Sequence, residues 1–425
     1  MDHVANYPIV RKLGEGATSE VFLCQDPFRS RQVAVKRIFP ESLRDPARGR
    51  LFRKLFFTEA SLAGKLDHPH IAQIYDAGIG EDSGYIVMEY VPGGTMERFC
   101  APEHLLPVEE TVEIIFKSAR ALAYAHTQGV THRDIKPGNL LFASAPTDVR
   151  IGDFGLALNL GAETTQITGV GSPAYMSPEQ IREELVDHHT DIYSLGVVLY
   201  QMLSGKLPFQ GTNKFSMIYQ ITQHDPAPPS SHRHEVPESL DRIVRRAMHK
   251  DARGRYHSGD EFADELVEAL RAGLGGGRRL PFGDADKFNS LRAMRFFARF
   301  SEPELWELVR IGVWERVPAG TEMVREGESG DFFCLLAEGE ARVTKNRKLL
   351  TVLGPGECFG EMAYLALDRR ERGATVTASQ DSHIMRVRIA DLEHASASCR
   401  SHVDRAFIGI LVERLNLANT RLTSG

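Results

Sequence analysis

Two short segments carry residues that could transfer a phosphoryl group. The first, "THRDIKPGNLLF", places five polar residues in a loop directly before a strand-like run: His132, Arg133, Asp134, Lys136 and Asn139. The second, "IGDFGLA", adds Asp153. One carboxylate can accept a hydroxyl proton, while an asparagine and a second aspartate can hold Mg²⁺ through oxygen. Phosphoryl transfer depends on positioning and charge neutralisation, and these residue types can supply both.

A third segment near the N-terminus could hold phosphate groups. "LGEGATSEVFLC" places Gly14, Gly16 and Ser19 between two strand-like runs, and small residues let backbone N–H groups approach phosphate oxygens. By itself this pattern indicates only a hairpin. The alternating run "VAVKRI" follows with Lys36, which we interpret as a fixed cation in a strand; a lysine on an edge strand is the alternative.

Larger elements must position these residues. A chain of 425 residues predicts two to three domains. "RAGLGGGRRLPFGDAD" stops a helix over 258–273 and predicts a flexible link. After it come a segment with helical spacing over 288–312, short apolar runs separated by turn signals over 322–388, and a final helix over 404–422. The regular turn signals predict a small all-β barrel or roll. We expect domains at 1–272 and 286–425, joined by a linker at 273–285.

Composition limits the partners and the compartment. The net charge of −6 without a Lys/Arg block predicts no nucleic-acid or membrane partner. Five scattered cysteines indicate a reducing compartment, and without a signal peptide or a bilayer-spanning run we expect a cytoplasmic protein. The histidine clusters "DHHTD" and "SSHRHE" lack metal-ligand spacing, so we interpret them as solvated loops.

Residues 7–270 resemble the eukaryotic-type (Hanks-type) serine/threonine protein kinases. Besides the segments above, "SPEQ", "DIYSLG" and "KDARGRY" match the family in order, and "GSPAYMSPEQ" has the style of bacterial members. The resemblance implies a bilobal α+β kinase fold that uses ATP and Mg²⁺ and phosphorylates Ser/Thr hydroxyls of protein substrates as a non-specific serine/threonine protein kinase.

The resemblance also implies a role for each residue. Asp134 deprotonates the acceptor hydroxyl, Lys136 neutralises the transferred group, and Lys36, oriented by Glu59, holds the α- and β-phosphates. Asn139 and Asp153 hold Mg²⁺. "MEYV" at 88–91 is the hinge beside adenine. The expected ATP-contacting residues are Leu13, Gly14, Glu15, Gly16, Val21, Ala34, Lys36, Met88, Glu89, Val91, Asn139 and Asp153.

An arginine beside the catalytic aspartate implies control by phosphorylation. In kinases that resemble this chain, a phosphate on the activation segment neutralises that arginine, here Arg133. Counting back from Ser172 predicts Thr168 as the phosphosite, with Thr164 and Thr165 as alternatives.

The predicted barrel contains an anion site of its own. "GECFGEMAYLALDRRERGATVTA" combines Gly360 and Glu361 with a following arginine. An arginine fork pairs with phosphate, a glutamate accepts a sugar hydroxyl, and backbone N–H groups at a helix N-terminus bind anions. A nucleotide whose phosphate and ribose lie close together would satisfy all three.

Residues 286–415 accordingly resemble cyclic-nucleotide-binding domains, which are β-barrels or jelly rolls with flanking helices. The resemblance assigns Glu361 to the ribose 2′-hydroxyl, Arg372 to the cyclic phosphate, and the N–H groups of Gly360, Ala363 and Gly373 to the anion site; Arg369 and Arg370 are rival arginines. Gly373 stands where relatives selective for cGMP often carry Thr or Ser, so the resemblance implies a preference for cAMP over cGMP. In the last helix Phe407, Ile410, Leu411 and Leu415 are predicted to pack in the core, with Phe407 an alternative cap for the base.

Two alternatives stay open. The kinase fold could serve an inactive signalling adaptor, and the barrel could be a docking module that binds no nucleotide. Kinases that prefer basic substrates carry carboxylates at places where this chain has Thr95, Gly138 and Gln220, so we expect weak selection for arginine. We also expect any inhibition to come from the barrel and not from "GRRLPF" in the linker.

Overall fold

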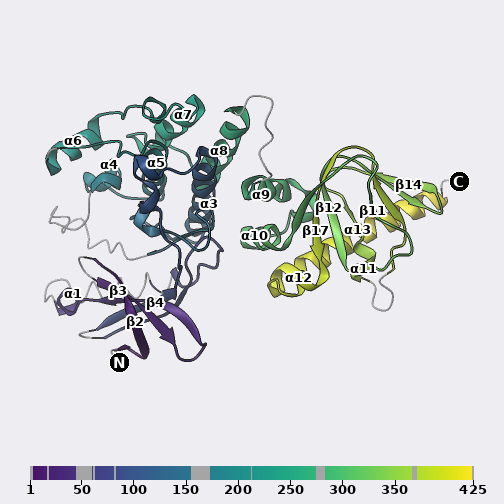
Figure 1. Ribbon diagram of the computed structural model, residues 1–425, viewed down its shortest axis with the longest axis horizontal. Helices are drawn as coiled ribbons and strands as arrows, with labels where there is room; N and C mark the ends of the chain where they lie inside the picture. The colour runs from purple at the N-terminus through teal and green to yellow at the C-terminus, as the bar shows by residue number, and fades with distance from the viewer. Residues whose placement is uncertain are drawn as a thin grey trace. The chain divides into compact units, whose positions relative to one another are not determined.

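The chain forms two compact units, Met1–Arg279 and Leu280–Gly425. The computed structural model describes residues 3–16, 19–44, 60, 63–80, 83–154, 173–211, 213–273, 283–365 and 371–423. Each unit has its own sheets and helices (Figure 1). Among the described residues, no helix has the length and apolar character that a bilayer span requires.

The first unit begins with a six-stranded antiparallel sheet in the order β1-β2-β3-β4-β6-β5. Its strands are β1 (His3–Val4), β2 (Tyr7–Glu15), β3 (Ser19–Asp26), β4 (Arg31–Ile38), β5 (Ile74–Ile79) and β6 (Gly84–Glu89). Lys36 in β4 pairs with Val21 of β3 on one side and Ile86 of β6 on the other. The lysine therefore stands on an inner strand, which excludes the edge-strand alternative.

A helical lobe follows the sheet (Figure 1). Its helices are α3 (Val108–Thr127), α4 (Pro178–Ile181), α5 (His189–Ser204), α6 (Lys214–Gln223), α7 (Glu238–Ala247) and α8 (Gly259–Gly273), and a small sheet orders β7 (Gly94–Thr95), β8 (Leu140–Phe142) and β9 (Val149–Ile151). Helices α3 and α5 bury most of their residues because other elements of the lobe pack around them. The helix predicted over 258–273 is confirmed as α8.

The second unit contains two four-stranded antiparallel sheets, ordered β10-β17-β12-β15 and β11-β16-β13-β14. The strands are β10 (Val313–Val317), β11 (Glu322–Val324), β12 (Phe332–Glu338), β13 (Ala341–Lys345), β14 (Lys348–Leu353), β15 (Cys358–Phe359), β16 (Thr375–Ala378) and β17 (Ser382–Arg388). One core joins both sheets through residues such as Val324, Leu336 and Ile384. The predicted small all-β roll is confirmed.

Helices flank this roll. They are α9 (Asp284–Ala293), α10 (Glu302–Ile311), α11 (Glu361–Leu365), α12 (Ile389–Glu393) and α13 (Ala397–Thr423). The predicted final helix is confirmed as α13, whereas the helical segment expected over 288–312 is divided. A short 3₁₀ turn at Arg295–Phe297 and a cap at Ser301 separate α9 from α10, because Ser301 and Glu304 form a reciprocal capping box that starts a new helix.

Two predictions of environment are wrong. His188 and His189 are half-buried at the start of α5 and not in a solvated loop. Ligand atoms of Asp187, His188 and His189 lie within 4.8 Å of one another, although no further observation points to a metal there. In α13, Phe407 is fully buried as expected, but Leu415 is 61% exposed because the second half of the helix extends beyond the core.

Candidate phosphoryl-transfer and nucleotide-binding sites

Asp191 of α5 fixes the loop that carries the predicted catalytic residues. Its buried carboxylate accepts hydrogen bonds from the backbone N–H groups of His132 (2.8 Å) and Arg133 (2.7 Å), and from Nε2 of His126 (2.8 Å). Burial alone would raise the pKa of Asp191, but the hydrogen bond and charge of His126 outweigh it and the pKa is lowered. The negative charge of Asp191 therefore holds the backbone of this loop in place.

The next residues converge at Asp134. Lys136 Nζ lies 2.7 Å from Asp134 Oδ2, and Asn139 Nδ2 donates to the Asp134 backbone carbonyl (2.7 Å) and to Oδ2 (3.1 Å). Because these bonds use the nitrogen of the Asn139 side chain, its oxygen is left to bind a cation. The Asp134 side chain is 49% exposed, so an incoming hydroxyl can reach it.

Lys36 and Asp153 meet although 117 residues separate them in the chain. Lys36 Nζ lies 3.2 Å from Asp153 Oδ1. Asp153 has a φ of 58°, in the left-handed region that is unfavourable for most residues with a side chain. The loop after β9 thus directs a carboxylate at the lysine of β4.

Four of the residues predicted to contact ATP belong to one apolar cluster on the sheet or pack against it. Ala34, Ile86 and Met88 belong to one apolar cluster, and the partly buried Leu13 and Val21 pack against it. A side-chain carbon built on Gly14 would meet no atom within 4 Å, so the glycine leaves open space next to the strand. Val91 is buried beyond the end of β6.

Several predicted residues have further contacts or lie outside the described residues. Glu89 pairs with Arg150 at 3.0 Å, and its backbone N–H donates to the Gln73 carbonyl. Glu15 ends β2, and the Gly16 N–H donates to the Ser19 carbonyl at 2.7 Å. Glu59 and the phosphosite candidates Thr164, Thr165 and Thr168 lie outside the described residues.

A buried ion pair connects the end of the activation segment to the helical lobe. Arg255 donates from two nitrogens to the two carboxylate oxygens of Glu179, each at 2.7 Å, and both side chains are buried. Next to it, Gln180 Nε2 donates to the Arg133 carbonyl at 2.9 Å. The "SPEQ" and "KDARGRY" segments therefore support the catalytic loop from one side.

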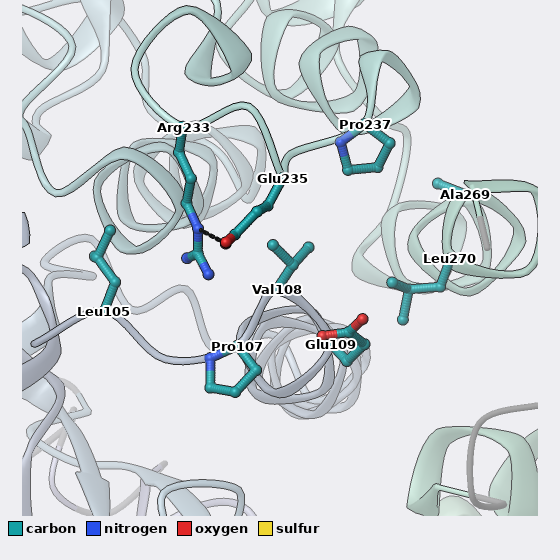
Figure 2. Close-up of a pocket in the computed structure, with 9 residues that line it drawn as sticks. All are labelled: Leu105, Pro107, Val108, Glu109, Arg233, Glu235, Pro237, Ala269 and Leu270. Atoms are coloured by element: carbon teal, nitrogen blue, oxygen red, sulfur yellow. Dashed lines mark hydrogen bonds and ion pairs between the residues drawn. The ribbon is translucent and has the colours of Figure 1, made fainter. Parts of the chain in front are cut away.

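A cavity of about 470 Å³ lies elsewhere in the helical lobe. Figure 2 shows its lining, which comes from the start of α3, the loop before α7 and the end of α8, with Arg233 paired to Glu235. None of the predicted ATP-contacting or catalytic residues lines this cavity. We therefore define the candidate site by the polar residues that converge at Asp134 and not by this cavity.

In the second unit, Arg372 lies between two glycines. Its Nη1 donates to the Gly360 carbonyl at 3.0 Å, and its guanidinium stacks 4.3 Å from the centroid of the Phe332 ring. A side-chain carbon on Gly330 would lie 2.2 Å from Arg372 Nε, so only glycine leaves room there. Arg372 Nη2 is buried without a hydrogen-bond partner among the described residues. Burial lowers the pKa of Arg372. A buried donor without a partner among the described residues is suited to an anionic ligand.

Glu361 is held by a residue that the sequence analysis missed. Arg414 of α13 forms an ion pair with Glu361 and donates to the Cys358 carbonyl at 3.0 Å. The Glu361 side chain is 6% exposed. Fifty-three residues separate the partners, and no motif around Arg414 indicated the contact.

The remaining predicted contacts lie near this pair. The Ala363 N–H donates to the Gly360 carbonyl at 3.3 Å, and a side-chain carbon on Gly373 would meet nothing within 4 Å. Phe407 is fully buried against Phe333 and Tyr364, so in this structure it packs in the core and does not present its ring to a ligand. Arg369 and Arg370 lie outside the described residues.

The chain belongs to the protein kinase domain family, whose sequence model matches residues 7–268. The model of the cyclic nucleotide-binding domain matches residues 314–398. Both predicted resemblances are confirmed, and so is the mixed α+β architecture.

Relatives of the first unit are bacterial. The chain is 38% identical over 269 residues to serine/threonine-protein kinase PknB of Mycobacterium tuberculosis, and 34% identical over 288 residues to serine/threonine-protein kinase PrkC of Bacillus subtilis. These matches cover 61% and 67% of this chain but 42% of each relative, so the chain spans about two-fifths of their length. A crystal structure of a point mutant of the Mycobacterium tuberculosis PknI kinase domain matches with a TM-score of 0.51 at 30% identity, covering 64% of this chain and 100% of that domain.

Proposed function

We propose that the first unit is an active serine/threonine protein kinase that transfers the γ-phosphate of ATP to Ser/Thr hydroxyls of proteins. The observation that carries the proposal is the convergence of Asp134, Lys136 and Asn139 in one loop, next to the Lys36–Asp153 pair. Each of these five side chains lies within hydrogen-bonding distance of another of the five, which supports the proposal.

The roles follow from these contacts. Asp134 accepts the proton of the acceptor hydroxyl, because its carboxylate is half exposed and is oriented by Asn139. Lys136 neutralises the transferred group, and Lys36 holds the α- and β-phosphates. The Asn139 oxygen and the Asp153 carboxylate would hold Mg²⁺, which neutralises phosphate charge when bound.

Incubation with labelled ATP and Mg²⁺ tests this proposal against the inactive-adaptor alternative. Wild-type protein is expected to label itself or a general protein substrate, whereas Asp134→Asn is expected to lose labelling while it keeps its circular-dichroism spectrum. Labelling of well-folded Asp134→Asn at a rate close to that of the wild type would contradict the role of Asp134.

Thr168 is proposed as the main phosphosite of the activation segment. Its support is its position four residues before Ser172 and the presence of Arg133 beside Asp134. Mass spectrometry of the active protein is expected to find phosphate on Thr168; phosphate only on Thr164 or Thr165 would move the assignment.

We further propose that the second unit binds a cyclic purine nucleotide, with cAMP preferred over cGMP, and that this binding regulates the kinase. The support is the buried Arg372 Nη2 without a partner among the described residues, which is suited to a phosphate oxygen, next to Glu361 and the Gly360 backbone. A ligand can regulate only if it binds two states of the kinase with different affinity.

The docking-module alternative also has an observation in its favour. Arg414 already pairs with Glu361, the residue assigned to the ribose, so the site is partly satisfied from within. Calorimetric titration with cAMP and cGMP separates the two proposals. Binding of cAMP at micromolar concentration supports the sensor, and no heat from either nucleotide at millimolar concentration supports the docking module.

The five cysteines bear on the compartment. All five are unpaired, and four of them are buried. We propose a reducing compartment such as the cytoplasm, where thiols persist. The protein would be isolated without reductant, unfolded and then labelled with a thiol reagent. All five cysteines are expected to react as free thiols.

A further inference from the structure

Glu97 places a carboxylate against the catalytic loop. It lies in a 3₁₀ turn (Met96–Phe99) after the predicted adenine hinge, and its side chain is exposed. A side-chain carbon built on Gly138 would lie 2.8 Å from Glu97 Oε1. Gly138 does not need glycine for its backbone, since its φ is not positive. The absence of a side chain at 138 instead leaves room for the carboxylate of Glu97.

The charge of Glu97 is not neutralised within the described part of the chain. No ion pair or side-chain hydrogen bond involves it there. Its effect reaches two neighbours. Burial, with the Glu97 charge adding to it, raises the pKa of Cys100 to about 12, and burial together with the charges of Cys100 and Glu97 raises the pKa of Tyr175. Tyr175 lies just before "SPEQ", so the charge of Glu97 also acts near the end of the activation segment.

Glu97 lies within reach of a peptide whose acceptor is at Asp134. Gly138 is four positions after Asp134, so their Cα atoms lie within about 14 Å of each other. An extended peptide advances about 3.3 Å per residue. A substrate residue within about four positions of an acceptor hydroxyl at Asp134 can therefore reach Glu97.

We propose that Glu97 selects protein substrates that carry an arginine or lysine within four residues of the phosphorylated Ser or Thr. The proposal rests on the proposed kinase activity and names its substrate class. It revises the expectation of weak selection for arginine, which considered Thr95, Gly138 and Gln220 only. Gln220 bonds to the backbone of Gln210 from both ends of its amide. The carboxylate comes instead from a position two residues after Thr95 and fills the space that Gly138 leaves.

A positional peptide scan tests the proposal on the full-length protein. Peptides with one Ser or Thr acceptor carry a single arginine at each position from −4 to +4, and kcat/KM is compared with that of the all-alanine peptide. Wild-type protein is expected to prefer arginine at one position by about tenfold, as a charge-assisted contact at a partly exposed site provides. Glu97→Gln is expected to reduce that ratio to about twofold or less, and Glu97→Arg to favour glutamate at the same position.

The matched control is Glu103→Gln, which removes an exposed carboxylate from the next 3₁₀ turn and should keep the wild-type ratio. Failure of the proposal is distinct from failure of the kinase assignment. Transfer to peptides without any arginine preference, or a preference that Glu97→Gln leaves unchanged, overturns the role of Glu97 only. No transfer by wild-type protein to any peptide or to itself overturns both.

Discussion

The two candidate sites use the same kinds of residues but satisfy them differently. In the kinase unit, Lys36 pairs with Asp153 and Lys136 pairs with Asp134. Both members of each pair have a proposed role in phosphoryl transfer. In the roll, Glu361 pairs with Arg414, which is assigned to no ligand, and Arg372 keeps a buried nitrogen without a partner among the described residues. In the proposed kinase site the charged groups therefore already pair with one another, whereas the proposed ligand of the roll would replace one contact and complete another.

This difference has an energetic consequence. A preassembled site needs little rearrangement when its substrate binds, which favours catalysis by positioning. A site that must break an internal ion pair couples ligand binding to the element that supplies the pair, here α13. The pair thus favours the docking module if no nucleotide displaces it, and under the sensor proposal a bound nucleotide would change what the helix contacts.

The largest expected effect tests the preassembled kinase site. Lys36→Met removes the cation next to Asp153 and is expected to abolish phosphoryl transfer, a loss of at least about a thousandfold. The steady-state rate of labelling from ATP measures it. Lys12→Met, which removes another lysine of the same sheet, serves as the control and should retain activity. Loss of activity in both variants would indicate damage to the sheet and not loss of a phosphate contact.

The second prediction compares a buried ion pair of the kinase unit with an exposed one of the roll. Arg255→Met leaves the Glu179 carboxylate buried without its cation and is expected to cost about 3–5 kcal/mol of unfolding free energy. Arg316→Met breaks the exposed pair with Asp381 and should cost less than about 1 kcal/mol. Urea denaturation monitored by fluorescence measures both, and equal losses would contradict the difference in burial.

The same buried pair predicts a pH dependence. Burial acts to raise the pKa of Glu179, but the hydrogen bonds and charge of Arg255 outweigh it and the pKa is lowered. Because the folded-state pKa lies below the unfolded value, the stabilisation is complete above the unfolded value and is lost as the pH falls through the folded value. Thermal unfolding at a series of pH values from neutral into the acid range should show the kinase transition falling as the carboxylate is protonated. An increase in the stability of the kinase unit on acidification would contradict this prediction.

The third prediction concerns the buried arginine of the roll. Arg372→Ala removes a charge-assisted phosphate contact, and we expect cAMP affinity to fall about ten- to a hundredfold, which corresponds to about 1.5–3 kcal/mol. Glu361→Ala is expected to weaken binding as well. Arg370→Ala is the comparison, since it removes a rival arginine. If Arg370→Ala weakens binding and Arg372→Ala does not, the phosphate arginine has been assigned wrongly.

The smallest expected effect belongs to Arg414. Its ion pair competes with a ribose hydroxyl for Glu361, so Arg414→Ala is expected to raise cAMP affinity by about two- to fivefold, within the range of a partly exposed ion pair. Calorimetric titration of this variant beside the wild type measures the change. Weaker binding would mean that Arg414 contacts the nucleotide and does not compete with it.

Much of the kinase site could be predicted because its residues are close in the chain. Asp134, Lys136 and Asn139 share one loop, so one short sequence motif contains all three. Lys36 and Asp153 could be paired only through the resemblance to a family, since 117 residues separate them. Glu97 and Gly138 were each visible in the sequence, but their contact was not, because it joins two loops that only the folded lobe brings together.

The sequence by itself determined the two-part organisation and the all-β character of the second unit, and it predicted the loop residues of each candidate site. These follow from local patterns: glycine spacing, alternation of apolar residues and short motifs. Only the tertiary structure decided that Arg414 holds Glu361, that Arg372 Nη2 lacks a partner among the described residues and that Leu415 is exposed. Each depends on where a helix or loop ends in space relative to a distant segment, and the side-chain pattern of a single element carries no information about that distance.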